Sequence, residues 1–191
     1  MRPPSLPRAH LDGWRRVSET TERPFAAGPV SVEAHTLRYE RTGPTPRPFV
    51  FASRLQIRPE TAPNAALTRL VERQAKSGFR DRLAARDIDA VEHRGDRAIA
   101  IDDPNASQAT LSTFRGRCVT ADGAGESTDG DRGESVAVEA LLAVWVADGY
   151  LLAGGAYPVP DDAYPAGRDA SAARRDLLRI VRGVTPGSSG E

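Results

Sequence analysis

The residues with the clearest potential chemistry form two rows of basic side chains at helical spacing. The first row is Arg69, Arg73, Lys76 and Arg80, and the second is Arg168, Arg175, Arg179 and Arg182. A basic helix face can bind acidic proteins, phosphates or membrane surfaces. The simpler interpretation is that both rows are the solvated outer faces of helices packed on a sheet. If either row functions, we expect an anionic partner, because the predicted helices lack Trp and Phe for entering lipid headgroups, apart from Phe79 beyond a predicted break.

The motifs of known catalytic sites do not occur in this chain. The histidines His10, His35 and His93 are scattered, and none has the spacing of a metal-ligand motif. The segment Gly125–Asp129 lacks the final glycine of a nucleophile elbow. Cys118 is the only cysteine, which excludes an internal disulfide and a Cys-based zinc site. We therefore predict no catalytic, cofactor-binding or metal-binding residues.

One acidic segment, residues 121–133, has oxygen ligands that could attract a hard cation. Its acidic side chains, with the glutamate that follows it, are Asp122, Glu126, Asp129, Asp131 and Glu134. The spacing departs from the calcium-binding EF-hand loop, because Gly133 stands at a ligand position. We predict a mobile hairpin loop that binds no metal tightly.

The balance of charge limits the kinds of partner. The 191 residues include 26 Lys and Arg and 26 Asp and Glu, so the formal net charge is zero, and we expect no specific nucleic-acid binding. Residues 1–7 lack the apolar stretch of a signal peptide. No apolar run approaches the ~18 residues of a membrane span. These features favour a soluble cytoplasmic protein.

The strongest structural signal is a β-hairpin near the C-terminus. Apolar residues occupy every second position in Val136–Ala147, Asp148-Gly149 follows, and a second apolar segment runs over Tyr150–Tyr157. Asp-Gly between alternating apolar residues is typical of a two-residue type I′ turn, because glycine accepts a positive φ. We predict two adjacent antiparallel strands joined by this turn.

The remaining elements follow from apolar periodicity and from turn residues. A helix capped by Asn64 should break or kink at Ser77-Gly78, and a second short helix should then reach Arg86. A strand bulge near His35-Thr36 would reconcile two apolar parities. A last helix is expected over residues 168–184. The other predicted strands are Trp14–Thr20, Val30–Arg41, Phe49–Ile57, Ile88–Glu92, Arg97–Ile101 and Gln108–Val119.

This order predicts an α+β fold: an antiparallel sheet of about six to seven strands with a mid-chain helix and a C-terminal helix packed on it. We expect one domain over residues 14–184, a flexible arm over 1–13 and a flexible tail over 185–191. The order of elements resembles the PsbP/Mog1-like fold. The resemblance rests on Pro48–Phe51, on the hairpin and on Asp176–Val181 in the last helix. It implies an accessory or partner-binding protein, since most members are not catalytic.

Two functional hypotheses follow. The first is a non-enzymatic domain that binds an unidentified protein partner, and a filled core with an exposed apolar or basic patch would favour it. The second is a small-molecule-binding or hydrolytic protein with a pocket between the sheet and the C-terminal helix. A cavity lined by Trp145, Tyr157 and a histidine–acid pair would favour this second hypothesis. The sequence leaves the oligomeric state open.

Overall fold

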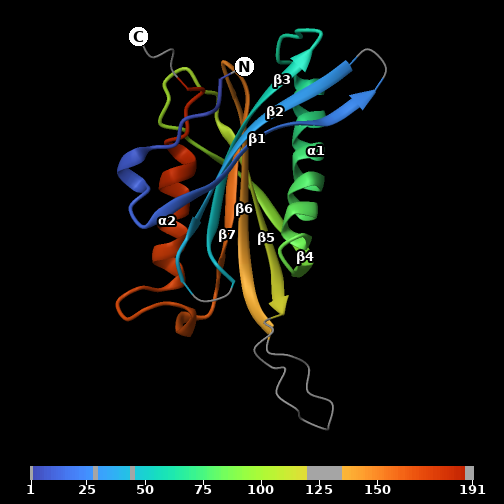
Figure 1. The fold of residues 1–191 in the computed structure, drawn as a ribbon. Coiled ribbons are helices and arrows are strands. Elements are labelled where there is room, and N and C mark those ends of the chain that lie inside the picture. Colours follow the sequence, from blue (N-terminus) through green and yellow to red (C-terminus); the bar gives the residue numbers. More distant parts are fainter. Residues whose placement is uncertain (1, 28–29, 44–45, 120–134, 188–191) are drawn as a thin grey trace.

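The computed structural model describes residues 2–27, 30–43, 46–119 and 135–187 (Figure 1). The predicted acidic loop over 121–133 lies outside these residues. The helices are α1 (Ala65–Ala84) and α2 (Ala170–Arg182), with short 3-10 turns η1 (Arg8–His10) and η3 (Asp161–Ala163). The strands are β1 (Trp14–Ala27), β2 (Val30–Arg41), β3 (Phe49–Arg58), β4 (Ile88–Ile99), β5 (Ala109–Val119), β6 (Ser135–Ala147) and β7 (Gly149–Pro158).

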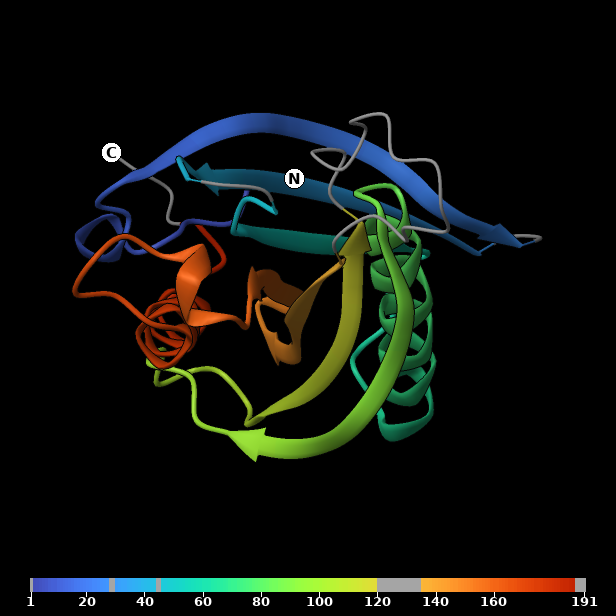
Figure 2. The ribbon, with the colours of Figure 1, turned by 90° about the horizontal axis from the view of Figure 1, so that it is seen from below.

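In the described residues the strands form one seven-stranded sheet in the order β1-β2-β3-β7-β6-β5-β4. Every neighbouring pair is antiparallel. The curved sheet lies between the two helices, with α1 on one side and α2 on the other (Figure 2). The predicted α+β class, with a mid-chain and a C-terminal helix on an antiparallel sheet, is confirmed.

The central strands are apolar on both faces because each face is covered by a helix. Trp145, Leu151 and Leu177 belong to the core beneath α2, whereas Leu142 and Phe79 belong to the core beneath α1. Since strand side chains alternate between faces, both parities of β6 and β7 are buried. Two cores of this kind require long apolar strands, which the sequence supplies mainly in the C-terminal hairpin.

The same two-sided burial corrects the prediction for β2. The pairing of β2 with β1 and β3 runs through His35 and Thr36 without a shift, so the predicted bulge there is wrong. Ala34 lines a groove beneath α1, and Leu37 lies in the core beneath α2. The two apolar parities of this strand therefore serve two different cores.

The β6–β7 hairpin is confirmed, but its turn differs from the predicted two-residue connection. Ala147 pairs with Gly149, and Val146 pairs with Tyr150, so the hairpin is centred on Asp148. Gly149 has φ +89°, whereas a type I′ turn would need positive φ at both central residues. The register matches a three-residue loop that ends in a left-handed glycine. Asp148 accepts a hydrogen bond of 2.5 Å from Arg54, which fixes the loop to β3.

Helix α1 begins where predicted and continues past the predicted break. The Asn64 side chain accepts a hydrogen bond of 3.0 Å from the Leu67 backbone N–H, as an N-cap does. The helix passes through Ser77 and Gly78 without interruption. A glycine inside a helix costs only about 1 kcal/mol. Burial of Phe79 and Leu83, both at most 2% exposed, outweighs that cost.

Strand β4 replaces the two short strands predicted around His93–Asp96. It pairs with β5 from Ile88 to Ile99, with register shifts between Asp89 and Glu92 and between His93 and Gly95. These irregularities are β-bulges rather than a turn. Because β4 is an edge strand, bulges and charged side chains along it discourage pairing with other chains.

The N-terminal segment, expected to be a free arm over residues 1–13, packs on the C-terminal end of α2. Ser5 and Thr185 exchange two backbone hydrogen bonds of 2.9 and 3.0 Å. Leu6 is 5% exposed and belongs to the core beneath α2. Thr185, assigned by prediction to a flexible tail, is therefore paired as well. The domain boundaries at 14 and 184 stay predictions.

Candidate functional site

An apolar groove of about 240 Å³ lies between α1 and the sheet. Its floor comes from β2, β3, β6 and β7, and its other wall is the face of α1 from Leu67 to Arg82. Its apolar lining residues are Val32, Ala34, Phe51, Leu55, Ile57, Leu67, Leu70, Val71, Ala75, Phe79, Leu142 and Leu152. Concave apolar surface with few polar groups is the usual form of a small-molecule site.

The groove has small residues on both sides: Gly78 on α1, and Ala34 and Ser53 on the sheet. Leu67, Val71, Gln74, Gly78 and Arg82 all line it and fall within about 80° of arc on α1, at 100° per residue. Gly78 stands in the middle of this row, and a Cβ added there would meet no atom within 4 Å. The glycine that suggested a helix break instead leaves space beside the sheet.

Arg82 supplies a positive charge at the end of the apolar groove. It lies one helical turn beyond Gly78, and its guanidinium carbon is 5.2 Å from the centre of the Phe51 ring. Burial lowers the pKa of Arg82, the charge of Glu22 opposes this shift, and the charge of Arg38 adds to it. Among the described residues, no carboxylate lies within 4 Å of Arg82.

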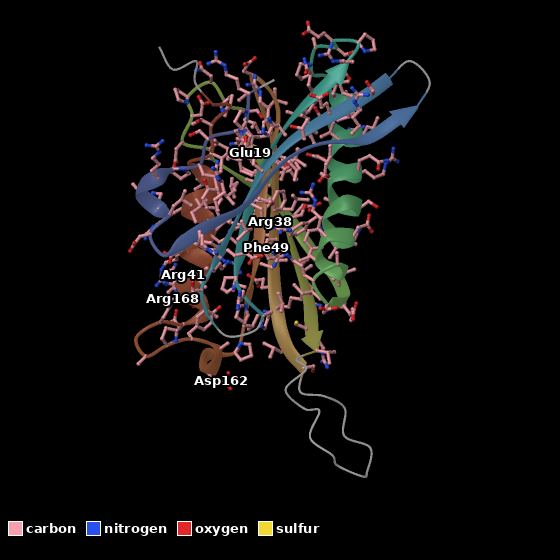
Figure 3. The ribbon with its side chains drawn as sticks, in the orientation of Figure 1. Glu19, Arg38, Arg41, Phe49, Asp162 and Arg168 are labelled. Carbon is pink, nitrogen blue, oxygen red and sulfur yellow. The ribbon has the colours of Figure 1, made fainter. Side chains whose placement is uncertain are left out.

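Arg38 places a second guanidinium on the same face of the sheet. Arg38, which is labelled in Figure 3, stands opposite Phe51 in the β2–β3 pairing. Its Nε atom is buried and has no hydrogen-bond partner within the described part of the chain. Two basic groups with incomplete pairing thus flank Phe51, whose ring lines the groove. This arrangement can hold the anionic end of a ligand whose body is apolar.

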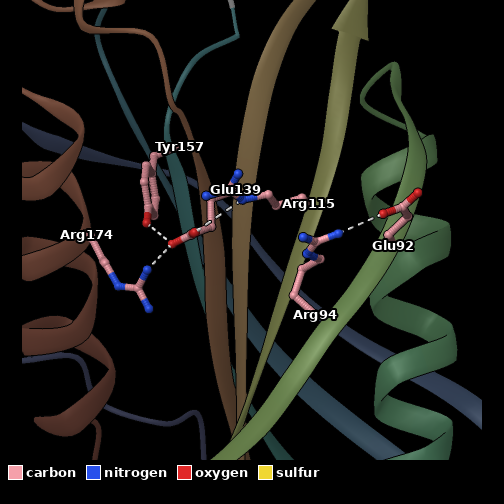
Figure 4. A network of polar contacts seen from close by, with 6 residues as sticks. All are labelled: Glu92, Arg94, Arg115, Glu139, Tyr157 and Arg174. Carbon is pink, nitrogen blue, oxygen red and sulfur yellow. Dashed lines mark hydrogen bonds and ion pairs between the residues drawn. The ribbon is translucent and has the colours of Figure 1, made fainter.

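The opposite face of the sheet carries a buried polar network around Glu139 (Figure 4). The Glu139 side chain is 7% exposed. Its Oε1 accepts hydrogen bonds from the Tyr157 hydroxyl and, at 2.6 Å, from Arg174 of α2. Arg115 lies 3.9 Å from Oε2. Burial raises the pKa of Tyr157, and the hydrogen bond to Glu139 and its charge raise it further. The tyrosine therefore stays a neutral donor.

A cleft of about 130 Å³ lies beside this network, between the sheet and α2. Tyr157 lines it, as the small-molecule hypothesis expected. Trp145 is 2% exposed and lies in the core, so it is not a cleft residue. The expected histidine–acid pair is also missing from the cleft lining. Its remaining polar side chains include Arg41 and Arg168.

The two predicted basic rows belong to α1 and to α2 with the segment before it, and these helices lie on opposite sides of the sheet (Figure 2). The rows therefore do not form one surface. Half of the eight residues are engaged within the described structure: Lys76 with Asp96, Arg80 with the Phe114 ring, and Arg168 and Arg179 with Asp176. The other four, Arg69, Arg73, Arg175 and Arg182, are exposed and form no ion pair with described residues.

The histidines do not converge. His35 contacts Glu19 at 3.1 Å, and His93 contacts Asp96 at 2.8 Å. Burial raises the pKa of Asp96, but hydrogen bonds from Lys76, Ser112 and His93 outweigh it and lower the pKa to about 2. No group of three histidine, cysteine or acidic residues within the described ranges could hold a metal ion.

The site residues missed by the sequence reasoning include Arg38, Arg82 and Glu139. Glu139 did leave a signal, since it is the only polar residue among Ala137, Leu141, Ala143 and Trp145 on one face of its strand. A lone acid on an apolar face needs a buried partner. Arg82 has the helical position of a core residue, one turn after Gly78 on the row that begins with Leu67. That signal was hidden by the predicted break.

The fold defines an α+β domain whose antiparallel sheet has a grooved face beneath α1 and a polar network beneath α2. The chain belongs to the family described as Domain of unknown function (DUF6517), which matches residues 3–185. Neither a curated protein nor a solved structure matches it. The resemblance to the PsbP/Mog1-like fold stays a prediction. Within the described ranges, neither helix has the length and apolar character needed to cross a membrane.

Proposed function

We propose that this domain is a non-enzymatic binding protein whose ligand is a small amphiphile with an apolar body and one anionic group. The ligand lies in the groove beneath α1, and its anionic end faces Arg82. The observation that carries the proposal is the half-buried Arg82, which has no carboxylate within 4 Å in the described residues and lies at the end of a mostly apolar groove. The proposal keeps the accessory role implied by the PsbP/Mog1-like resemblance and the cytoplasmic location, both of which stay predictions.

The size of the groove selects the ligand class. A volume of 240 Å³ equals that of about eight water molecules in the liquid, and it is smaller than the ~300–1,000 Å³ of sites for drug-sized molecules. A single short alkyl chain or one small ring system fits this space. Half-buried Leu55, Ile57 and Leu67 would become covered, and the burial of apolar area would drive binding.

The charge pattern selects an anion over a cation. Arg82 is repelled by Arg38, and both lie on the side of the sheet that Phe51 occupies. An anionic group would relieve this repulsion and form charge-assisted hydrogen bonds, which are about twice as strong as neutral ones. Glu22 and the groove residue Asp81 oppose this preference, but both are exposed, so solvent screens them.

Calorimetric titration with octanoate, and with octyltrimethylammonium as the cation of equal chain length, tests the proposal. We expect saturable binding of octanoate and at least about tenfold weaker binding of the cation, since a lost charged hydrogen bond corresponds to about that ratio. Arg82→Gln should reduce octanoate binding by a similar factor. Arg69→Gln, on the exposed face of the same helix, is the matched control and should bind like the parent.

Filling the groove gives a second test that does not depend on charge. Gly78→Leu places a side chain in the open space of the Leu67–Arg82 row, and it should abolish octanoate binding. Gly78→Ala gives the same gain in helix propensity with little added volume, and it should retain binding. Equal affinity of the two variants for octanoate would refute the groove as the site.

A second candidate function is binding of an acidic protein segment by the outer face of α2. The observation that favours it is the exposure of Arg175, Arg179 and Arg182 along one helix, two of them without an ion pair in the described residues. This use of the predicted rows needs no cavity. Of the two rows, the one on α2 has its three exposed members closest together in sequence.

An oligoglutamate peptide is the probe for this candidate. Reversing Arg175, Arg179 and Arg182 to Glu should eliminate peptide binding measured by fluorescence anisotropy. The matched control reverses Arg69, Arg73 and Arg80 on α1 and should leave the affinity unchanged. Equal loss in both variants would indicate a general charge effect and contradict a specific surface on α2.

A further inference from the structure

We propose that the cleft between the sheet and α2 is a second binding site, which takes a small oxyanion such as a phosphate or a short carboxylate. The cleft lies on the other side of the sheet from the groove beneath α1, and nothing in the proposed function uses it. Arg41 at the end of β2 and Arg168 before α2 lie close together at its edge (Figure 3).

The cleft has more positive than negative groups. Asp176 is the one carboxylate within 4 Å of three guanidiniums in the described structure: Arg168 at 2.6 Å, Arg41 at 3.6 Å and Arg179 at 3.9 Å. Asp12 also attracts Arg41. The charged side chains in the described lining of the cleft are Arg41 and Arg168, and this lining contains no carboxylate. Burial and repulsion from Arg168 lower the pKa of Arg41. A bound anion would remove that repulsion.

An uncommitted donor also belongs to the cleft. Trp14 lines it, and its indole N–H is buried without an acceptor among the described residues. The Trp14 ring lies under the Arg41 guanidinium, 5.7 Å from ring centre to the guanidinium carbon. A buried donor without a partner is costly. An oxyanion between Arg41 and Arg168 offers several acceptor oxygens for such a donor.

The size and the walls of the cleft restrict the ligand. A volume of 130 Å³ equals that of about four water molecules. This admits a phosphate or a carboxylate of a few carbon atoms. Tyr164, Leu177 and Pro48 are among the other lining residues and exclude part of the solvent, which strengthens hydrogen bonds to a charged group. Tyr157 already donates its hydroxyl to Glu139, so the arginines and the indole supply the donors.

The test follows the indole N–H resonances of the intact protein while inorganic phosphate is added. The chain has two tryptophans, and the variant Trp14→Phe identifies which indole signal belongs to Trp14. We expect saturable movement of the Trp14 signal and a constant Trp145 signal. Acetate in place of phosphate distinguishes the two sources of the oxyanion, and sodium chloride at equal ionic strength is the control.

Two substitutions report on the arginines. Arg168→Gln should weaken phosphate binding by about tenfold or more, the ratio expected for one charged hydrogen bond, whereas Arg175→Gln on the outer face of α2 should not change it. Asp176→Asn removes the competing carboxylate and should tighten binding. The proposal is overturned if the Trp14 signal follows chloride as it follows phosphate, or if Asp176→Asn weakens binding.

Discussion

One helix covers each face of the sheet, and the packing beneath α2 is closer than the packing beneath α1. Beneath α2, Leu177, Ile180 and Val181 are at most 2% exposed, and Leu177 packs where Gly155 of β7 has no side chain. A Cβ at Gly155 would lie 3.0 Å from Leu177 and 2.0 Å from the Phe49 carbonyl oxygen. Beneath α1, Gly78 leaves open space instead. Gly155 on the sheet lets Leu177 pack close to the backbone, whereas Gly78 on α1 leaves space that a larger side chain would fill.

The buried polar groups on the two faces also differ, because those beneath α2 are more fully paired than those beneath α1. The charge of Glu139 beneath α2 has two arginines around it, and Tyr157 donates to it. The charge of Arg82 beneath α1 has no carboxylate within 4 Å among described residues. A buried charge that has an ion-pair partner is compensated within the fold. A charge that lacks such a partner and lies beside a cavity is available to a ligand. This contrast is why the groove carries the proposed function.

The largest expected difference between the faces concerns leucine truncation. Leu177→Ala should lower the free energy of unfolding by about 2–5 kcal/mol, because it leaves a cavity in a closed core. Leu67→Ala should lower it by only about 1 kcal/mol, because the side chain is half-buried and borders existing space. Urea unfolding of both variants measures the difference. Equal losses would show that the groove wall is as tightly packed as the core beneath α2.

The polar pairs provide the next comparison. Glu139→Gln removes the charge that faces Arg174 and Arg115, and it should lower the free energy of unfolding by about 1–3 kcal/mol. Ser53→Ala beneath α1 breaks the neutral 2.7 Å hydrogen bond to Thr36 and should cost about 1 kcal/mol. Chemical denaturation at pH 7 measures both. A larger loss for Ser53→Ala would contradict the structural importance assigned to Glu139.

Acid titration tests the cluster at the edge of the α1 face. The pKa of Asp96 is lowered from 3.8 to about 2 in the folded chain, so its contribution to stability is present above pH ~4. That contribution is lost as the pH falls from about 4 to about 2. Asp96 is 39% exposed, and solvent screening keeps the effect small. The free energy of unfolding of Asp96→Asn should therefore change less between pH 5 and pH 2.5 than that of the parent.

The smallest effect is expected on the outer helix faces. Exchanging Arg175 and Arg179 for Glu should change the free energy of unfolding by no more than about 0.5 kcal/mol, since exposed substitutions are usually tolerated. Arg69 and Arg73 exchanged for Glu should behave alike. Thermal unfolding checks both pairs. A loss of several kcal/mol in either pair would mean that the row is part of the packed structure.

Much of the fold could be predicted because its signals are local. The alternating residues of β6, the Asn64 cap and the apolar row of α2 each lie within one segment, and each appears as expected. Errors arose where a distant segment decides the outcome. The packing of Phe79 on the sheet keeps α1 continuous through Gly78, and pairing with β5 keeps β4 a single strand.

The candidate sites were less accessible for the same reason. The groove is lined by the small residues Ala34, Ser53 and Gly78, which come from three separate elements. The cleft requires Arg41 of β2 to reach Asp176 of α2. The sequence shows that Glu139 is a lone acid on an apolar strand face, but it does not show which arginine pairs with it. The basic rows were visible because helical spacing alone reveals them.

The most direct test of the difference between the faces is an NMR titration with octanoate that observes methyl groups on both sides of the sheet. We expect saturable shifts for Leu67, Val71 and Leu152, which line the groove, and constant signals for Ile180 and Val181 beneath α2, which line neither the groove nor the cleft. Saturable shifts of Ile180 and Val181 with octanoate, or no saturable shift beneath α1, would contradict the central claim that the open face beneath α1 binds the apolar anion.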